Sequence, residues 1–193
     1  MEIFNETQGD IPMEYNRKSA EAIFAMTSSY ESAIYNYFNK EEEGLLESVS
    51  INVKKFADLR YGENPHQGAA FYLPEGESPT WHQHQGKILS YNNYADMESA
   101  FNIPMEFSET ACAIIKHANP CGFGLGENSK KAFLRAVTTD PVSYFGGIVG
   151  FNREVDADIA EELMQPFLEC IIAPTFSDTA LEILKKKKNL RII

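Results

Sequence analysis

The hydrophobic and polar positions near the N-terminus follow the period of an α-helix. Apolar residues recur at helical intervals, among them Ile23, Tyr30 and Ile34. This pattern predicts one long amphipathic helix over residues 19–38, and the apolar face of such a helix needs a partner surface. Residues 1–11 mix polar, glycine and acidic positions without a period, so we expect a frayed terminus there.

The periodicity changes at the run EEEG, residues 41–44, which predicts a linker or boundary near residues 40–48. Alternating apolar and polar positions then predict a strand within residues 48–59. Residues 86–103 are typical of a short strand and a turn, followed by a helix that starts near residue 95.

From residue 111 onward, strand-like and helix-like segments alternate. Strands are expected at residues 111–115, 146–151, 170–174 and from 190, helices at 129–138, 156–167 and 177–188, and a turn at 117–126. Ser129 and Ser177 are the expected helix caps. The alternation predicts an α/β fold with a parallel or mixed sheet. Because the last residues, LRII, resemble the start of another strand, we expect the chain to be a piece of a longer protein.

Composition and charge narrow the function classes. The chain has 193 residues and 44% hydrophobic content, and its 17 basic and 28 acidic residues give a net charge of −11. This charge argues against general nucleic-acid binding, which needs a basic surface. With no apolar run near the roughly 20 residues that span a bilayer and no signal peptide, we expect a cytoplasmic protein without a membrane partner. The basic run at 185–191 is expected to be the solvated end of a helix.

Two short blocks carry titratable side chains where chemistry is possible. IIKHANPCG places Lys116 and His117 at the end of an apolar run, where a ligand of an α/β sheet commonly binds. A lysine can stabilise developing negative charge, and a histidine can act as base or acid near neutral pH. RYGENPHQ offers Arg60 to a phosphate and Tyr61 as a hydroxyl donor. Either block alone is also compatible with an ordinary polar turn.

Other motifs lack the residues that their chemistry needs. GFGLGENSK completes neither a phosphate-binding P-loop nor the dinucleotide fingerprint. His82 and His84 have no third ligand at a suitable spacing, and PCGFG is only half of a zinc-deaminase signature. The three cysteines are irregularly spaced and are expected to be reduced thiols, and Cys121 has no assigned base. We therefore predict no metal.

Five blocks together resemble a known family in order and spacing: LRYGENPHQ, GKILSYNN, IIKHANPCG, TDPVSYFGGIVGFNREVD and IIAP. They resemble the bacterial bifunctional purine-biosynthesis enzymes that join 5-aminoimidazole-4-carboxamide ribonucleotide (AICAR) formyltransferase to IMP cyclohydrolase. The resemblance implies that residues 1–48 are the tail of a cyclohydrolase-like domain and a linker, mostly helical. Residues 49–193 would be the N-terminal part of the formyltransferase domain, with one copy of a cytidine-deaminase-like α/β subdomain.

The resemblance also implies an activity, the transfer of a formyl group from 10-formyltetrahydrofolate to the 5-amino group of AICAR. His117 would be the general base, and Lys116 would stabilise charge in the transition state or assist departure of the folate nitrogen. The residues implied in nucleotide binding are Arg60, Tyr61, Asn64, His66, Gly86, Lys87, Asn92 and Asn119. The implied partners are AICAR, the folate and a second copy of the chain, because the family's formyltransferase site forms at a homodimer interface.

Some positions depart from the family pattern and leave alternatives open. Gly147 stands where some family members carry an acid, and Tyr144 replaces a small residue. The cyclohydrolase's catalytic segments have no counterpart here, so IMP cyclohydrolase activity is not expected from this chain. The alternatives are a nucleotide-binding chain that is catalytically incomplete and a dimerising structural remnant.

Overall fold

The computed structural model describes residues 2–40 and 44–193, which divide into two compact units. The first unit contains the described residues up to Lys55 together with Tyr72–Glu77, and the second contains Phe56–Phe71 and Ser78–Ile193. Part of the linker expected near residues 40–48 lies outside the described residues.

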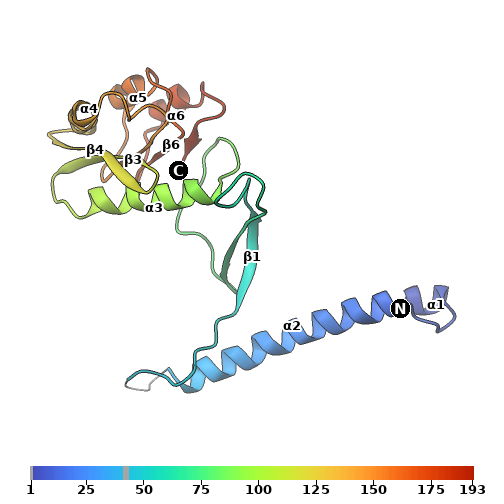
Figure 1. The fold of residues 1–193 in the computed structure, drawn as a ribbon. Coiled ribbons are helices and arrows are strands. Elements are labelled where there is room, and N and C mark those ends of the chain that lie inside the picture. The colour runs from blue at the N-terminus through green and yellow to red at the C-terminus, as the bar shows by residue number, and fades with distance from the viewer. Residues whose placement is uncertain (1, 41–43) are drawn as a thin grey trace. The chain divides into compact units, whose positions relative to one another are not determined.

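The first unit is built on two helices, α1 (Glu2–Glu6) and α2 (Met13–Phe38) (Figure 1). Helix α2 begins six residues before the predicted start, and α1 occupies part of the segment expected to be frayed. Every residue of α2 stays at least partly exposed. The contacts of α2 within its unit include hydrogen bonds, for example from the hydroxyl of Tyr35, which donates to the carbonyl of Ser48 at 2.7 Å. None of the described helices is both long and apolar enough to cross a membrane.

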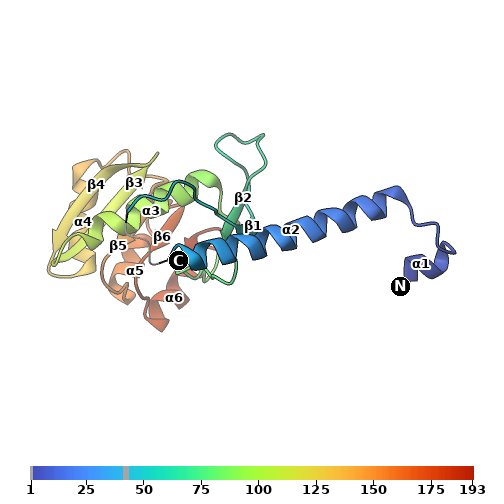
Figure 2. The same cartoon turned by 90° about the horizontal axis from the view of Figure 1, so that it is seen from below.

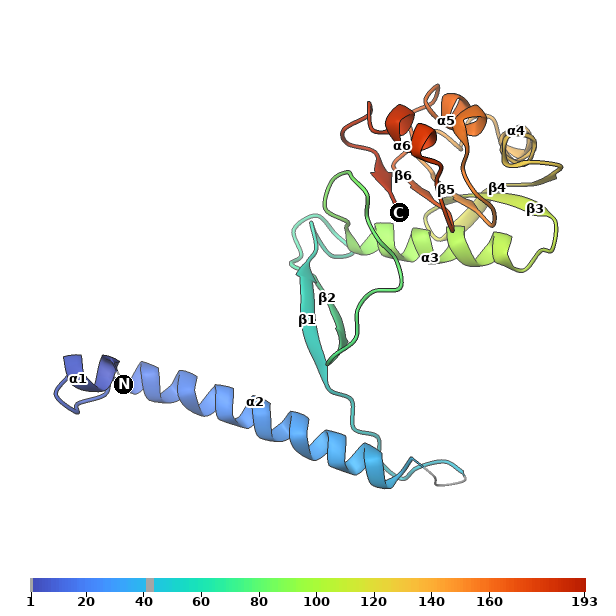
Figure 3. The same cartoon turned by 180° about the vertical axis from the view of Figure 1, so that it is seen from behind.

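Strands β1 (Val53–Asp58) and β2 (Ala70–Pro74) form a two-stranded sheet (Figure 3). Strand β1 falls inside the range 48–59 expected from alternation. Strand β2 was not predicted. Its sequence, AFYLP, is a short apolar run that lacks alternation, and this is a weak strand signal on its own.

The second unit contains a five-stranded mixed sheet. Its strands are β3 (Thr110–Lys116), β4 (Asn119–Gly126), β5 (Ile148–Phe151), β6 (Cys170–Ile172) and β7 (Arg191–Ile192), in the order β4-β3-β5-β6-β7. Strand β3 is antiparallel to both neighbours, whereas β5, β6 and β7 run parallel. The predicted α/β class with a mixed sheet is confirmed. The finer assignment to a cytidine-deaminase-like subdomain stays a prediction.

Helices cover both faces of this sheet and make a three-layer unit. They are α3 (Tyr91–Met105), α4 (Ser129–Thr139), α5 (Ala157–Leu163) and α6 (Asp178–Leu184). Helix α3 lies across β3, β5 and β6 on one face (Figure 2), and the other three helices lie on the opposite face (Figure 1). A hydrophobic core lies on each face of the sheet, and successive residues of β3 point into different cores. Ile114 packs in the core on the α4–α6 side, and Ile115 packs in the core on the α3 side.

Strand β4 corrects the expectation of a turn over residues 117–126. Only two residues turn, and the glycine-rich run NPCGFGLG is a strand paired with β3. Its glycines alternate at 122, 124 and 126, so they share one face. A Cβ atom at Gly122 or Gly124 would lie 2.4 Å from a carbonyl oxygen of α4, and one at Gly126 would lie 2.4 Å from a backbone nitrogen. The glycines therefore allow close packing of α4 on the sheet.

Two helix starts also differ from the sequence expectation. Helix α3 starts at Tyr91 because Ser90 caps it in a reciprocal pair with Asn93. Helix α4 is capped by Asn128 and not by Ser129, whose hydroxyl donates to the carbonyl of Glu154. The cap expected at residue 177 is confirmed.

Candidate functional site

The turn between β3 and β4 presents His117. It has two central residues, His117 and Ala118, with φ of 55° and 62°, which is the type I′ geometry that suits a tight hairpin. The amide of Ala118 donates to Oδ1 of Asp96 at 2.6 Å, and the side-chain amide of Asn119 donates to the carbonyl of His117 at 2.9 Å. These bonds fix the turn while His117 stays exposed.

The location of this turn in the sheet differs from the expectation. We expected Lys116 and His117 in a loop leading from a strand to a helix, but they close a hairpin. Because Ile115 pairs with Ile148, the first residue of β5, the hairpin lies at the end of the sheet where β5 begins. The carboxyl ends of the parallel strands lie at the opposite end of the sheet. The antiparallel direction of β3 explains the difference.

Lys116 is anchored at the end of β3. Its ammonium donates to the carbonyl of Phe145 at 2.8 Å, and its side chain is partly buried. The positive charge of Lys116 also acts on the carboxylate of Asp140. Hydrogen bonds from Ser143 and from the amide of Val142 lower the pKa of Asp140, and the charge of Lys116 lowers it further. An ammonium has three donors, so Lys116 can hold its anchor and still donate to a ligand.

The loop after β1 presents Arg60. The amide of Arg60 donates to the carbonyl of Leu89 at 2.9 Å, and the amide of Tyr91 donates to the carbonyl of Tyr61 at 3.1 Å. The guanidinium of Arg60 lies over the ring of Tyr61, 5.4 Å from its centroid. Asn64 and His66 are exposed in the same loop. The loop backbone is therefore fixed, while several polar side chains remain open to a ligand.

Helix α3 brings these two clusters together. The side-chain amide of Asn92 donates to the carbonyl of Glu63 in the loop after β1. Asp96, four residues further on, accepts from the amide of Ala118 in the hairpin turn. Residues four apart share one side of a helix, with Cβ atoms about 5–6 Å apart. The points at which α3 holds the loop of Arg60 and the turn of His117 are consequently one helical turn apart.

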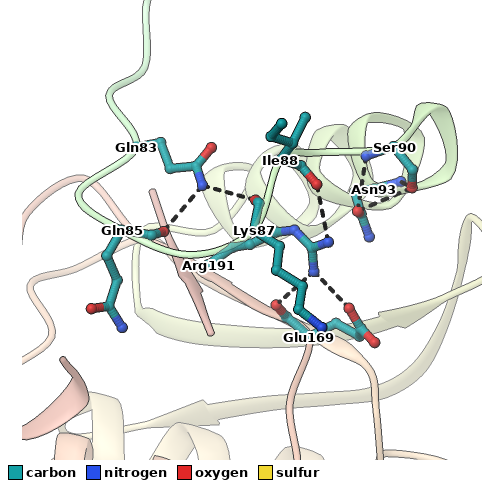
Figure 4. Close-up of polar contacts among 8 residues, drawn as sticks. All are labelled: Gln83, Gln85, Lys87, Ile88, Ser90, Asn93, Glu169 and Arg191. Atoms are coloured by element: carbon teal, nitrogen blue, oxygen red, sulfur yellow. Dashed lines mark hydrogen bonds and ion pairs between the residues drawn. The ribbon is translucent and has the colours of Figure 1, made fainter. Parts of the chain in front are cut away.

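Gly86 and Lys87 lie elsewhere, against β7. Residue 85 pairs with Ile192 in a single antiparallel bridge, which replaces the short strand expected here. Gly86 has a φ of 110°, and a Cβ atom there would lie 2.5 Å from the carbonyl oxygen of Leu190. Close packing against the backbone of residues 190 and 191 therefore requires a glycine at position 86, whether or not a ligand binds there. The carbonyl of Lys87 accepts from the side-chain amide of Gln83 (Figure 4), and its side chain is exposed.

An aromatic pocket of about 810 Å³ was not predicted from the sequence. It lies along another side of α3 and extends to the residues that follow β6. Rings of Phe71 and Tyr94 stack in its wall with centroids 4.8 Å apart, and Trp81 packs edge-on against Tyr94. His84 also lines it, and burial lowers the pKa of this histidine, as do the charges of His82 and Lys185. The tendency of ligands to bind beyond the carboxyl ends of strands could have indicated it.

Metal ligation and thiol chemistry find little support in the geometry. In the part of the chain that the structure describes, no three His, Cys, Asp or Glu side chains are grouped to hold a metal. The rings of His82 and His84 meet edge to face, 4.9 Å apart. The thiol of Cys121 lies 3.5 Å from the carbonyl of Ile114, and burial raises its pKa, which makes it a poor nucleophile.

The fold and the site define an α/β domain that presents an arginine, a lysine and a histidine on neighbouring loops. A model of the family described as the AICARFT/IMPCHase bienzyme matches residues 1–193. The chain is 46% identical over 186 residues to the bifunctional purine biosynthesis protein PurH of Clostridium perfringens, 48% over 187 residues to that of Fusobacterium nucleatum, and 49% over 185 residues to that of Oceanobacillus iheyensis. The chain belongs to the AICARFT/IMPCHase bienzyme family.

The matches cover most of this chain and a smaller share of its relatives. They include 95% of this chain and 37% of the Clostridium perfringens and Fusobacterium nucleatum proteins, and 93% and 36% in the Oceanobacillus iheyensis comparison. The chain therefore spans a little over a third of the length of these curated relatives.

Proposed function

We propose that this chain supplies the nucleotide-binding and proton-transfer residues of an AICAR formyltransferase. The full protein would transfer a formyl group from 10-formyltetrahydrofolate to the 5-amino group of AICAR in purine biosynthesis. The observation that carries the proposal is the joint attachment of two loops to one side of α3, through Asn92 and Asp96. It supports the proposal because the loop that carries Arg60 and the hairpin that carries Lys116 and His117 are attached to the same helix.

The proposed chemistry starts from the weak nucleophilicity of the AICAR amine, whose lone pair is delocalised into the ring and the carboxamide. His117 takes the proton from this nitrogen as it attacks the formyl carbon. Lys116 donates to the oxygen that becomes negative, or to the folate nitrogen that leaves. The bond of Lys116 to the carbonyl of Phe145 supports this role, because it fixes the ammonium before the substrate arrives.

In the proposed nucleotide site, Arg60 binds the phosphate of AICAR through its planar fork. Tyr61 lies under this guanidinium and restricts its orientation. Further donors and acceptors come from Asn64 and His66 in the same loop, from Asn92 at the start of α3 and from Asn119 after the hairpin turn. The aromatic pocket lies toward the carboxyl ends of β6 and β7, away from Lys116 and His117, so we do not assign it to the heterocycle that reacts.

The remaining proposals concern partners and domains. We infer that residues 1–48 belong to the end of a cyclohydrolase-like domain and that residues 49–193 are one cytidine-deaminase-like part of the formyltransferase domain. The strand order β4-β3-β5-β6-β7 and the three-layer arrangement are compatible with the second assignment. The active protein would be a homodimer and would need no metal, and the cyclohydrolase reaction is not assigned to this chain.

Replacement of His117 tests the proposed reaction. In a full-length protein that contains this chain, His117→Ala should abolish formyl transfer and change AICAR affinity by less than about tenfold, because a general base acts mainly in the transition state. Single-turnover formyl transfer and AICAR titration measure the two effects, with Lys130→Ala on α4 as a control. Unchanged turnover would remove His117 from the mechanism.

A further inference from the structure

The side chain of Arg191 on β7 is almost completely buried. Only 2% of it is exposed, and its guanidinium makes directed contacts with two other segments (Figure 4). Nη1 donates to Oε2 of Glu169 at 2.6 Å, and Nη2 donates to the carbonyl of Ile88 at 3.2 Å. Removing a charge from water is costly, so a buried arginine of this kind calls for an explanation beyond stability.

The contact with Ile88 leads to the loop of Arg60. The next residue, Leu89, accepts a hydrogen bond from the amide of Arg60 at 2.9 Å. Two residues further, the amide of Tyr91 donates to the carbonyl of Tyr61. The backbone of residues 88–91 is therefore held by Arg191 on one side and supports the proposed phosphate-binding loop on the other.

The contact with Glu169 leads to the anchor of Lys116. The amide of Glu169 donates to the carbonyl of Gly147 at 3.1 Å, and the amide of Gly146 donates to the carbonyl of Phe167 at 2.8 Å. These bonds fix the segment that precedes β5. The carbonyl of Phe145 in this segment is the acceptor that holds the ammonium of Lys116.

We propose that the ion pair of Arg191 and Glu169 is a positioning pair that holds the Arg60 loop and the Lys116 anchor in one fixed frame. Its functional part rests on the proposed roles of Arg60 and Lys116. Neither member of the pair needs to touch a substrate. The planar fork of arginine reaches Glu169 through Nη1 and Ile88 through Nη2, whereas a lysine keeps the charge but has a single nitrogen that cannot occupy both positions.

The test uses Arg191→Lys and, as a milder change of the same pair, Glu169→Gln. The control is Lys130→Met, which removes the ion pair of Lys130 and Glu162, 2.8 Å long, on the α4–α6 side of the sheet. Amide hydrogen exchange reports on positioning without any ligand. We expect exchange of the Arg60 and Tyr91 amides to become at least about tenfold faster in Arg191→Lys, with amides of β3 and β4 unchanged, because only the local frame loosens.

A second readout separates positioning from function. We expect the AICAR affinity of Arg191→Lys to fall at least about fivefold in calorimetry, and that of the control to stay unchanged. If exchange is locally faster in Arg191→Lys but the wild-type chain binds no AICAR, the positioning pair is upheld and the nucleotide site is rejected. Unchanged exchange at Arg60 and Tyr91, or a uniform increase at all amides, would overturn the positioning role.

Discussion

At the residue scale, the three cysteines differ sharply in access and acidity. Cys112 and Cys170 have no exposed surface, and Cys121 is partly exposed beside the hairpin of His117. Burial raises the pKa of the Cys170 thiol to about 12 and raises that of Cys112 well above its ordinary value. Reactivity depends on access and on the thiolate fraction, so the three thiols should react at very different rates.

Alkylation of the folded chain should therefore modify Cys121 first. At pH 8, iodoacetamide is expected to label one thiol per chain, and denaturant should expose the other two. Peptide mass spectrometry after timed quenching measures this order, and Cys121→Ser serves as the control that loses the early label. Early labelling of Cys112 or Cys170 in the folded chain would contradict the described core.

The capping residues explain why some helix starts could be predicted from the sequence and others could not. Ser177 was predictable as a cap because it directly precedes the apolar period of α6. Ser90 was missed because its partner, Asn93, is a less familiar third residue of the capping box than glutamate or glutamine. At α4, two adjacent polar residues, Asn128 and Ser129, could each cap the helix, and only the tertiary contact of Ser129 with Glu154 decides between them.

At the element scale, the contact between β4 and α4 depends on residues that have no side chain. The glycines at 122, 124 and 126 let the helix backbone approach the strand within the space of a Cβ atom. Gly124 lies deepest in this contact, because a Cβ atom would meet both the carbonyl of Ala132 at 2.4 Å and the amide nitrogen of Ala136 at 2.6 Å. No side-chain rotation can relieve a clash with two backbone atoms.

Replacement of Gly124 by alanine should accordingly destabilise the chain by about 1–3 kcal/mol, as overpacking of a tight core does. Urea unfolding followed by circular dichroism measures the change. Gly68→Ala is the matched control, because a Cβ atom there would meet nothing within 4 Å. Equal midpoints for the two variants would show that α4 does not pack on β4 as closely as described.

The same elements show why strands were predicted unevenly. Strands β3, β5 and β6 are short apolar runs that read directly from the sequence. Strand β4 contains three glycines, which are typical of turns and loops, and its strand character comes from pairing with β3 and from packing under α4. Its identity depends on tertiary contacts that a local pattern does not contain.

At the scale of the whole molecule, the candidate site is assembled from segments that are far apart in the sequence. Asn92 reaches Glu63 across 29 residues, and Asp96 reaches Ala118 across 22. The individual blocks were recognisable from the sequence, but their meeting on one side of α3 was not. Sequence spacing alone does not determine which loops a helix brings together, and the aromatic pocket was missed for the same reason.

The most direct test of the central claim is a calorimetric titration of this 193-residue chain with AICAR, repeated with Arg60→Ala. We predict that the wild-type chain binds and that Arg60→Ala weakens binding by about 1–3 kcal/mol, since the phosphate loses a charge-assisted pair of hydrogen bonds. Arg17→Ala on α2 should bind like the wild type. Equal affinity of Arg60→Ala and the wild type, or no binding by either, would contradict the assignment of the nucleotide site to this chain.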